Sequence, residues 1–330
     1  MNNDIFKYIS KSDNTSFSSF KGEELEDLFV LIDDFYMELR ESLGLSNDTT
    51  FGVEIEFEES NNVEIAKWLE VNHLTSWYLH NDISLKRGGE VTSNILYDTK
   101  ETYEELNTVC SIIKKQAKSL NNAGGHIHIG SQIINRDSKN LLNLLKLWAV
   151  YENIIFRFSY GEYLTGRRNI DHYAKAMHDE FINIYEKYKE SDISFLELIK
   201  VLKANTKYQA LNFNNVKQEE FDYGNTLEVR CPNATLNPVI WQNNINFFTK
   251  LFTYAKSLDF DYDKLDRRYN INKDNYNLYS MYNEIYLRQA LELCDLIFNN
   301  NLDKVYFLRQ YIKSFEVGDK PFVRAKVMTV

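Results

Sequence analysis

The chain has few of the residues that mark unusual classes of protein. Of its 330 residues, 12 are glycine and 3 are proline, which excludes collagen-like repeats and a disordered chain rich in these residues. No apolar run is long enough to span a bilayer. The first residues, MNNDIFKYISK, lack the apolar segment of a signal peptide. We therefore expect a globular protein that does not enter a membrane.

Cysteine is scarce as well. The chain has Cys110, Cys231 and Cys294, which lie far apart and form no CxxC pair. An odd number of cysteines at such spacing fits neither a disulfide framework nor a zinc site built from cysteines. We expect reduced thiols and a location in the cytoplasm.

Positive charge is in deficit. The chain has 38 Lys and Arg against 48 Asp and Glu, so its net charge is -10 at pH 7. Nucleic acid repels such a chain unless a local basic patch outweighs the total. The basic pair Arg167 and Arg168 is too small to follow a phosphate backbone. We expect no nucleic-acid partner, whereas an excess of carboxylates suits a protein that binds several Mg²⁺ ions and a nucleotide.

The chain does contain a mixed pattern of helices and strands. Spacing of apolar residues predicts helices over 22–43, 62–72, 101–121, 139–158, 239–258, 276–298 and 301–315. Strands are predicted over 51–57, 77–85, 88–96, 124–130, 207–213 and 225–231. Short, widely spaced strands that helices interrupt indicate an α+β protein.

Three of the predicted strands share one pattern. Side chains alternate between the two faces of a strand, so each of these strands has one apolar and one ionisable face. The ionisable pairs are Glu54 with Glu56, His126 with His128, and Glu228 with Arg230. A half-buried sheet with one wet face would show a similar alternation, so each strand alone also fits that simpler interpretation.

Together the ionisable residues indicate a metal site. The segment GGEV adds Glu90, so one face of a shared sheet would collect four carboxylates, two imidazoles and a guanidinium. Carboxylates at that density repel one another unless cations neutralise them. Oxygen-rich sites with little sulfur prefer Mg²⁺ or Mn²⁺.

Zinc sites and glycine-rich nucleotide-binding loops have sequence motifs of their own. His126 and His128 could hold zinc with a third ligand, although the chain has no HExxH motif. The chain also lacks GxxxxGK[ST] and GxGxxG, so ATP would have to bind through metal ions and side chains. The residues alone leave both a magnesium site and a zinc hydrolase open.

The order of five motifs resembles the amidoligase family. GVEIEFE is followed by NDISLKRGGEV, GGHIHIG, RRN and LEVRCPNATLNP, and the last string resembles the family pattern E-x-R-x-P…T-x-N-P. The resemblance covers about residues 50–240. This family belongs to the carboxylate–amine ligase superfamily of glutamine synthetase and γ-glutamyl-cysteine ligase. It implies a curved antiparallel sheet with helices on one face. The spacing of apolar residues adds helical N- and C-terminal regions, which lie outside the resemblance.

The resemblance also implies a reaction and its cofactors. ATP phosphorylates a carboxylate, and an amine then displaces phosphate to form an amide. Two or three Mg²⁺ ions, or Mn²⁺, bring the anionic nucleotide and the carboxylate together. The implied metal ligands are Glu54, Glu56, Glu90, His126 and Glu228; His128 and Arg230 contact the nucleotide phosphates, Arg230 also stabilises the transferred phosphoryl group, and Arg167 or Arg168 faces the acyl substrate.

The resemblance and the helical pattern at both ends divide the chain into three regions. Residues 1–45 form an N-terminal helical extension, residues 46–250 form the catalytic core, and residues 251–330 form a helical region packed on the core. We expect a carboxylate substrate and an amine substrate, which could be an amino acid, a peptide or a cell-wall peptide. A homo-oligomer stays open, as does a non-catalytic member of the fold. Asp82 and Ser84 lie near the site in the pattern without an assigned role.

Overall fold

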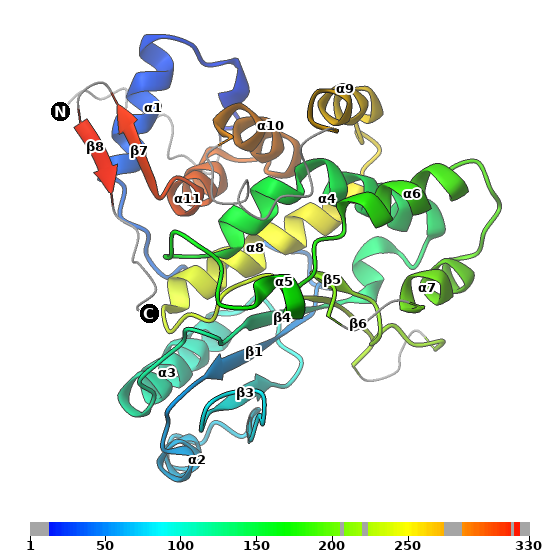
Figure 1. Ribbon diagram of the computed structural model, residues 1–330. Helices are drawn as coiled ribbons and strands as arrows, with labels where there is room; N and C mark the ends of the chain where they lie inside the picture. The colour runs from blue at the N-terminus through cyan, green and yellow to red at the C-terminus, as the bar shows by residue number, and fades with distance from the viewer. Residues whose placement is uncertain (1–12, 205–207, 220–223, 274–285, 318–319, 324–330) are drawn as a thin grey trace.

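A computed structural model describes residues 13–204, 208–219, 224–273, 286–317 and 320–323. Its centre is an antiparallel sheet of six strands in the order β2-β3-β1-β4-β6-β5 (Figure 1). The strands are β1 (Phe51–Phe57), β2 (Trp77–His80), β3 (Gly89–Ser93), β4 (Gly125–Gly130), β5 (Leu211–Asn212) and β6 (Thr226–Val229). The α+β class that the sequence predicts is confirmed.

Helices make up most of the remaining described chain. They are α1 (Glu23–Asp34), α2 (Asn62–Val71), α3 (Lys100–Gln116), α4 (Ser138–Ser159), α5 (Ile170–Tyr173), α6 (His178–Tyr188), α7 (Phe195–Lys203), α8 (Pro238–Ala255), α9 (Tyr262–Asn272), α10 (Leu287–Ile297) and α11 (Asn301–Tyr311), with short 3-10 helices η2 (Phe17–Ser19) and η3 (Ser131–Ile134). Across these described ranges, no helix combines the length and the apolar character that crossing a membrane requires.

The apolar face of the sheet packs on helices. Val53, Ile55 and Ile127 on this face are almost fully buried. Helix α8 approaches it so closely that a Cβ on Gly125 would lie 2.8 Å from the Trp241 ring, which explains why a residue without a side chain is needed there. Helix α3 covers the β2 side, where Trp77 Nε1 donates to Glu105 at 2.9 Å. The ionisable residues are therefore on the opposite face, as the alternation predicts.

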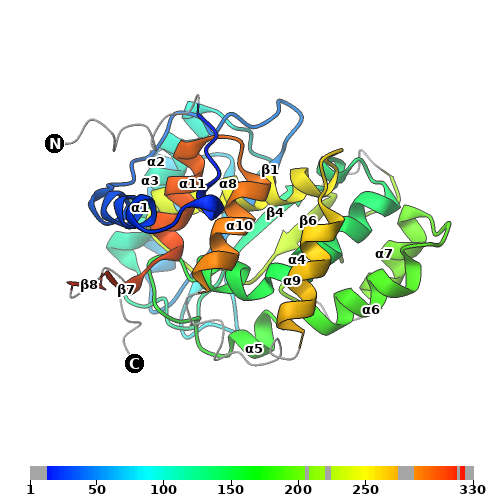
Figure 2. The same ribbon diagram turned by 90° about the horizontal axis from the view of Figure 1, so that it is seen from above.

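The N-terminal segment packs against the C-terminal helices (Figure 2). Asp295 of α10 accepts hydrogen bonds from the backbone N–H groups of Phe17 at 3.0 Å and Ser18 at 2.8 Å, and it pairs with Lys304 of α11 at 2.8 Å. One continuous apolar core includes Phe17 and Tyr311 together with the sheet. The boundaries expected after residues 45 and 250 stay a prediction.

Several predicted elements end earlier than expected. The helix predicted over 22–43 ends at Asp34, because its last turn has acidic residues and no basic one, which the helix dipole disfavours. After it, Arg40 N–H donates to Gln242 at 2.8 Å instead of to a helical carbonyl. The strand predicted over 77–85 ends at His80, since the Asp82 side chain accepts from Ser84 N–H at 2.7 Å and forms a turn.

The C-terminal region differs from the prediction as well. The helix predicted over 301–315 ends at Tyr311 and is followed by the hairpin of β7 (Ser314–Val317) and β8 (Lys320–Val323), so a wholly helical ending is wrong. Helix α9 was not predicted. Of the helix predicted over 276–298, residues 276–285 lie outside the described residues, as does residue 207 of the strand predicted over 207–213.

Candidate active site

The register of the two central strands brings the ionisable residues of β1 and β4 together. Glu54 lies directly opposite His126, and His128 lies opposite Gly52 on β1 and Glu228 on β6. All of these positions are on one face of the sheet, because directly paired residues of antiparallel strands share a face. The three strands with one pattern are therefore neighbours, as the sequence predicted.

Glu54 binds both histidines. One oxygen, Oε2, lies 2.8 Å from His126 Nδ1, and the other, Oε1, lies 2.8 Å from His128 Nε2. Burial alone would raise the pKa of Glu54, but the hydrogen bonds from the two imidazoles hold it well below its usual value. Burial would likewise lower the pKa of His128, and the contact with Glu54 outweighs that effect and raises it. The contacts with the two histidines therefore favour the ionised form of the Glu54 carboxylate.

Glu54, His126 and Glu228 form a compact group that we call the His126 cluster. Their donor atoms all lie within 4.8 Å of one another. Glu228 is held by Asn212, whose Nδ2 donates at 2.7 Å, and by an ion pair with Arg230. His126 is 3% exposed, and among the described residues its buried Nε2 has no hydrogen-bond partner, while Glu56 Oε1 lies 3.5 Å from it. A buried imidazole nitrogen without a hydrogen bond, close to converging carboxylates, suits a cation.

Glu56, Asp82 and Glu90 form a second group, the Glu90 cluster, with donor atoms within the same 4.8 Å limit. Glu56 and Glu90 are paired across β1 and β3, and Asp82 comes from the turn after β2. Burial, followed by repulsion from Glu54, Glu56 and Asp82, raises the pKa of Glu90 to about 7. Carboxylates held together against this repulsion have the chemistry of a magnesium or manganese site.

Asp82 was near the site in the sequence pattern, but no role was assigned to it. Its place in the Glu90 cluster depends on the turn that follows β2 and on the pairing of β2 with β3. Neither feature follows from the spacing of residues alone. The nearest sequence signal is that Asp82 lies in the strand predicted over 77–85 and Glu90 in the strand predicted over 88–96, which a short turn joins.

The two neighbouring arginines have opposite environments. Arg167 is 3% exposed, and its guanidinium donates to the backbone carbonyls of Pro232 at 2.6 Å and Arg230 at 3.0 Å. Burial lowers the pKa of Arg167, although the charge of Glu56 acts in the opposite direction. A Cβ on Gly124 would lie 2.9 Å from His126 Nε2 and 3.0 Å from the Arg167 guanidinium, so that charge lies beside the His126 cluster. Arg168 is exposed, so the structure selects Arg167 as the inward residue. The sequence left open which of the two arginines faces the substrate, and a role for either stays a prediction.

Glu58 is a buried residue that sequence analysis did not select, although it continues the alternation of Glu54 and Glu56. It is 2% exposed and accepts hydrogen bonds from Asn122 Nδ2 at 2.7 Å, Asn122 N–H at 3.1 Å and Lys86 N–H at 3.4 Å. It thereby joins the turn before β4 to the turn before β3. Within the first turn, Gly124 N–H donates to Glu56. Glu58 therefore holds both turns that border the carboxylate clusters.

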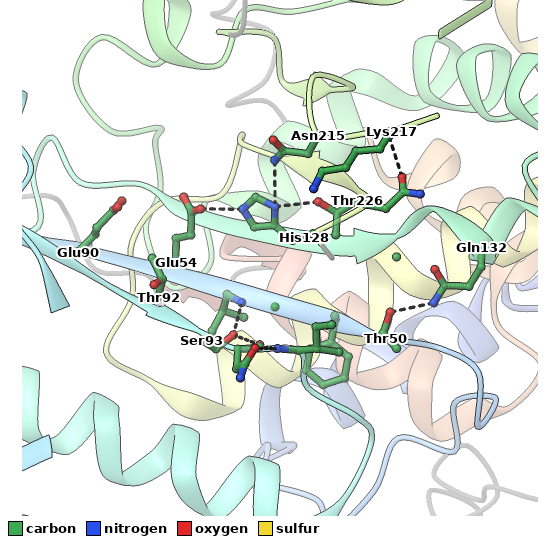
Figure 3. A pocket seen from close by; sticks show the side chains of 18 of the residues that line it. Thr50, Glu54, Glu90, Thr92, Ser93, His128, Gln132, Asn215, Lys217 and Thr226 are labelled. Carbon is green, nitrogen blue, oxygen red and sulfur yellow. Dashed lines mark hydrogen bonds and ion pairs between the residues drawn. The ribbon is translucent and has the colours of Figure 1, made fainter. Parts of the chain in front are cut away.

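A pocket of about 840 Å³ opens beside the two clusters (Figure 3). Glu54, Glu90 and His128 line one part of it, Thr50 and Gln132 line the other, and Lys217 lies on the side of His128. A pocket of this volume lies in the range that small molecules and nucleotides occupy. The site therefore joins two acidic groups to a cavity large enough for a bound cofactor.

The protein is therefore an α+β protein in which two acidic clusters lie on one face of an antiparallel sheet. The family model described as "Putative amidoligase enzyme" matches residues 71–252, more than half of the chain. The chain belongs to this amidoligase family, and the family's description is that of a ligase that forms amide bonds. A search of the curated proteins finds no match. The matched residues include Asp82, Glu90, His126 and Glu228, while β1 precedes them.

Proposed function

We propose that the protein is an ATP-dependent carboxylate–amine ligase that works through an acyl phosphate, on a sheet related to that of glutamine synthetase and γ-glutamyl-cysteine ligase. The observation that carries the proposal is the pair of clusters that β1 joins, with Glu54 in one and Glu56 in the other. A nucleotide and a carboxylate substrate are both anions that repel each other, so bound cations are needed to bring them together.

The residues of each cluster fit a hard divalent cation. The His126 cluster offers two carboxylates and one imidazole, and the Glu90 cluster offers three carboxylates. We assign one Mg²⁺ or Mn²⁺ ion to each, since oxygen-rich sites select these ions. Bound there, the ions would neutralise phosphate charge and polarise phosphoryl oxygens.

The remaining residues have roles that their positions support. His128 lines the pocket and is held by Glu54, so its ring is oriented to contact a phosphate. Arg230 is fixed by Glu228 and carries a fork of donors for the transferred phosphoryl group. Arg167 is assigned to the acyl side of the site because it lies toward Glu56.

The reaction balances as two displacements. A carboxylate oxygen of the first substrate attacks the terminal phosphorus of ATP, and ADP leaves. The nitrogen of the amine then attacks the acyl carbon, phosphate leaves with the bonding electrons, and the nitrogen loses a proton. The substrates belong to the classes of amino acids, peptides or cell-wall peptides. We place the reaction in the cytoplasm, which the three free and buried cysteines support.

A zinc hydrolase has less support from the geometry. His126 and His128 bind different oxygens of Glu54, and His128 Nδ1 lies 3.1 Å from the Thr226 hydroxyl. A shared zinc would require both rings to turn one nitrogen to a common point. The two imidazoles therefore fit separate partners better than one ion.

The test begins with nucleotide binding. Calorimetry should detect ATP binding in the presence of Mg²⁺, and EDTA or the substitution Glu228→Ala should abolish it. Adding hydroxylamine to the protein with ATP and a panel of carboxylates should trap an acyl phosphate as a hydroxamate. ATP binding that EDTA leaves unchanged would contradict the proposal. Stoichiometric zinc in the purified protein, without nucleotide affinity, would favour the hydrolase.

A further inference from the structure

The 840 Å³ pocket follows β1 and β4 away from the two clusters (Figure 3). Glu54 pairs with His126 beside the clusters, and at the other end the Gly130 N–H donates to the Thr50 carbonyl at 3.0 Å. Thr50 and Glu54 are four residues apart on one face of the sheet, which is roughly 13 Å of extended chain. A nucleotide whose transferred phosphate lies at the clusters therefore has its opposite end near Thr50.

The Gln132 side chain folds back over Gly130 at this far end of the pocket. A Cβ on Gly130 would collide with the Gln132 amide and the Thr50 hydroxyl, so the missing side chain leaves the space that the amide occupies. Gln132 Nε2 donates to the Asp48 carbonyl at 3.0 Å and to the Thr50 hydroxyl at 2.8 Å. A backbone carbonyl can only accept, so the amide nitrogen has to face Asp48 and the orientation of the amide is fixed.

These contacts use both hydrogens of the Gln132 amide and leave its oxygen. Within the part of the chain that the structure describes, Gln132 Oε1 accepts no hydrogen bond, and the Thr50 hydroxyl has no acceptor for its own proton. Both residues line the pocket. The far end of the pocket therefore offers a fixed acceptor beside a hydroxyl donor.

The part of the pocket between its two ends has an open floor. Gly52 lies between Thr50 and Glu54 on the same face of β1, opposite His128, and has no side chain to cover that face. The exposed side chain of Ile95 also lines the pocket. An open floor with an aliphatic side chain near it suits an uncharged ring system.

We propose that Gln132 is a specificity residue for the base of the nucleotide. Its Oε1 accepts from the 6-amino group of adenine, and the Thr50 hydroxyl donates to the neighbouring ring nitrogen. This inference rests on the function proposed above, which places the transferred phosphate at the clusters and leaves the base for the far end. Adenine presents an amino donor beside a nitrogen acceptor, which complements this pair of groups. Hypoxanthine has an oxygen in place of the amino group, and that oxygen has no proton to donate to Oε1.

The experiment compares nucleotides that differ only at this position of the base. Calorimetry with Mg²⁺ measures the affinities of ATP, of purine riboside triphosphate, which lacks the 6-amino group, and of inosine triphosphate. Wild-type protein should bind purine riboside triphosphate about 10-fold less tightly than ATP, because one hydrogen bond is lost, and inosine triphosphate less tightly still. Gln132→Met removes the amide, so ATP should weaken by about 10-fold while purine riboside triphosphate changes little.

The control is Gln116→Met, which changes a half-buried residue at the end of α3 outside the pocket and should bind all three ligands as the wild type does. If the wild type binds ATP and purine riboside triphosphate equally well, the inference about Gln132 is overturned while the proposed function stands. An equal loss of both ligands in Gln132→Met would also overturn it, because the contact would then not be to the amino group. The comparison within the wild type stays decisive if Gln132→Met does not fold. If the wild type binds no nucleotide with Mg²⁺, the proposed function itself fails, and the inference fails with it.

Discussion

Glu54 on β1 and His126 on β4 face each other directly across the two central strands, with 2.8 Å between Oε2 and Nδ1. A slip of one residue in this pairing would turn one of the two side chains to the apolar face. The apolar residues Val53 and Ile127 pair in the same register and are buried. Burial of that face therefore maintains the alignment of the ionisable face.

Removing the charge of Glu228 should weaken the binding of a divalent cation. Glu228→Gln leaves the Asn212 contact feasible but loses a negative ligand and the partner of Arg230. Affinity for Mn²⁺ should fall at least about 10-fold, as measured by calorimetry or by the electron paramagnetic resonance signal of free Mn²⁺. Glu70→Gln, on an exposed position of α2, is the matched control. Unchanged Mn²⁺ binding in Glu228→Gln would remove this residue from the metal site.

Substitutions of the two histidines should have different effects on metal binding and on ATP binding. His126→Gln removes the imidazole of the His126 cluster, so Mn²⁺ affinity should fall with ATP affinity. His128→Gln should weaken ATP by about 10-fold while Mn²⁺ alone binds nearly as before, since His128 is assigned to phosphate. Parallel titrations of both variants with Mn²⁺ and then with ATP measure the difference. An equal loss of metal from both variants would point to one shared ion.

Glu90 should make the metal-free protein less stable as the pH rises. Its folded pKa of about 7 exceeds the ordinary value of 4.5, so the folded state holds a proton that the unfolded state releases between these values. Stability due to this proton is present below pH 4.5 and is lost as the pH rises through 7.

The substitution Glu90→Gln tests this relation. In EDTA at pH 8 it should raise the melting temperature above that of the wild type, and the difference should vanish near pH 4.5. With Mn²⁺ added, the order should reverse, because the wild type gains stability from the ion and Glu90→Gln gains less. If Glu90→Gln melts at a lower temperature than the wild type at pH 8 without metal, the neighbouring carboxylates do not destabilise the ionised form of Glu90.

Arg167 and Arg168 should differ in their effect on stability and on turnover. Arg167→Met takes the guanidinium donors away from the carbonyls of Arg230 and of Pro232, which keeps the Gly125 N–H at 3.0 Å, and should cost about 1–3 kcal/mol in the free energy of unfolding. Arg168→Met changes an exposed residue and should stay within about 0.5 kcal/mol. Urea unfolding gives both values, and phosphate release should fall much further in Arg167→Met. The reverse order would reassign the inward role to Arg168.

Asp295 should anchor the N-terminal segment in a pH-dependent way. Burial would raise the pKa of Asp295, but Lys304 and the Ser18 N–H hold it below its ordinary value of 3.8. This contribution is present above that value and is lost as the pH falls through the lower, folded pKa. Asp295→Asn should cost about 3–5 kcal/mol at pH 7, because the buried ammonium of Lys304 loses its carboxylate partner and keeps only neutral ones such as the Thr15 carbonyl at 2.7 Å.

Urea unfolding of wild type and Asp295→Asn between pH 7 and pH 3 measures this contribution. The difference between them should shrink below pH 4, where the wild-type carboxylate also takes up a proton. Asp27, an exposed residue of α1, provides a control: Asp27→Asn should change stability little over the same pH range. A difference that is constant over this pH range would assign the effect to packing.

Much of the candidate site could be predicted because alternation along a strand is a local property. Glu54, His126 and Glu228 were selected from the sequence and lie within one cluster. Glu58 was not selected, although it lies in the same run of alternating residues, because its partners Asn122 and Lys86 come from turns far along the chain. The sequence pattern reports which face a residue occupies and does not report what lies beside it.

The sequence by itself determined the α+β class, the apolar and ionisable faces of the strands, and the family resemblance, since each depends on residue type and short-range spacing. Only the tertiary structure decided that Asp82 joins Glu56 and Glu90, that Arg167 is buried while Arg168 is exposed, and that Lys217 reaches the pocket. The physical reason is that strand order, turn conformation and backbone anchoring are set by contacts between segments far apart in the chain. Those contacts bring together charges whose repulsion becomes evident only when the residues share one surface.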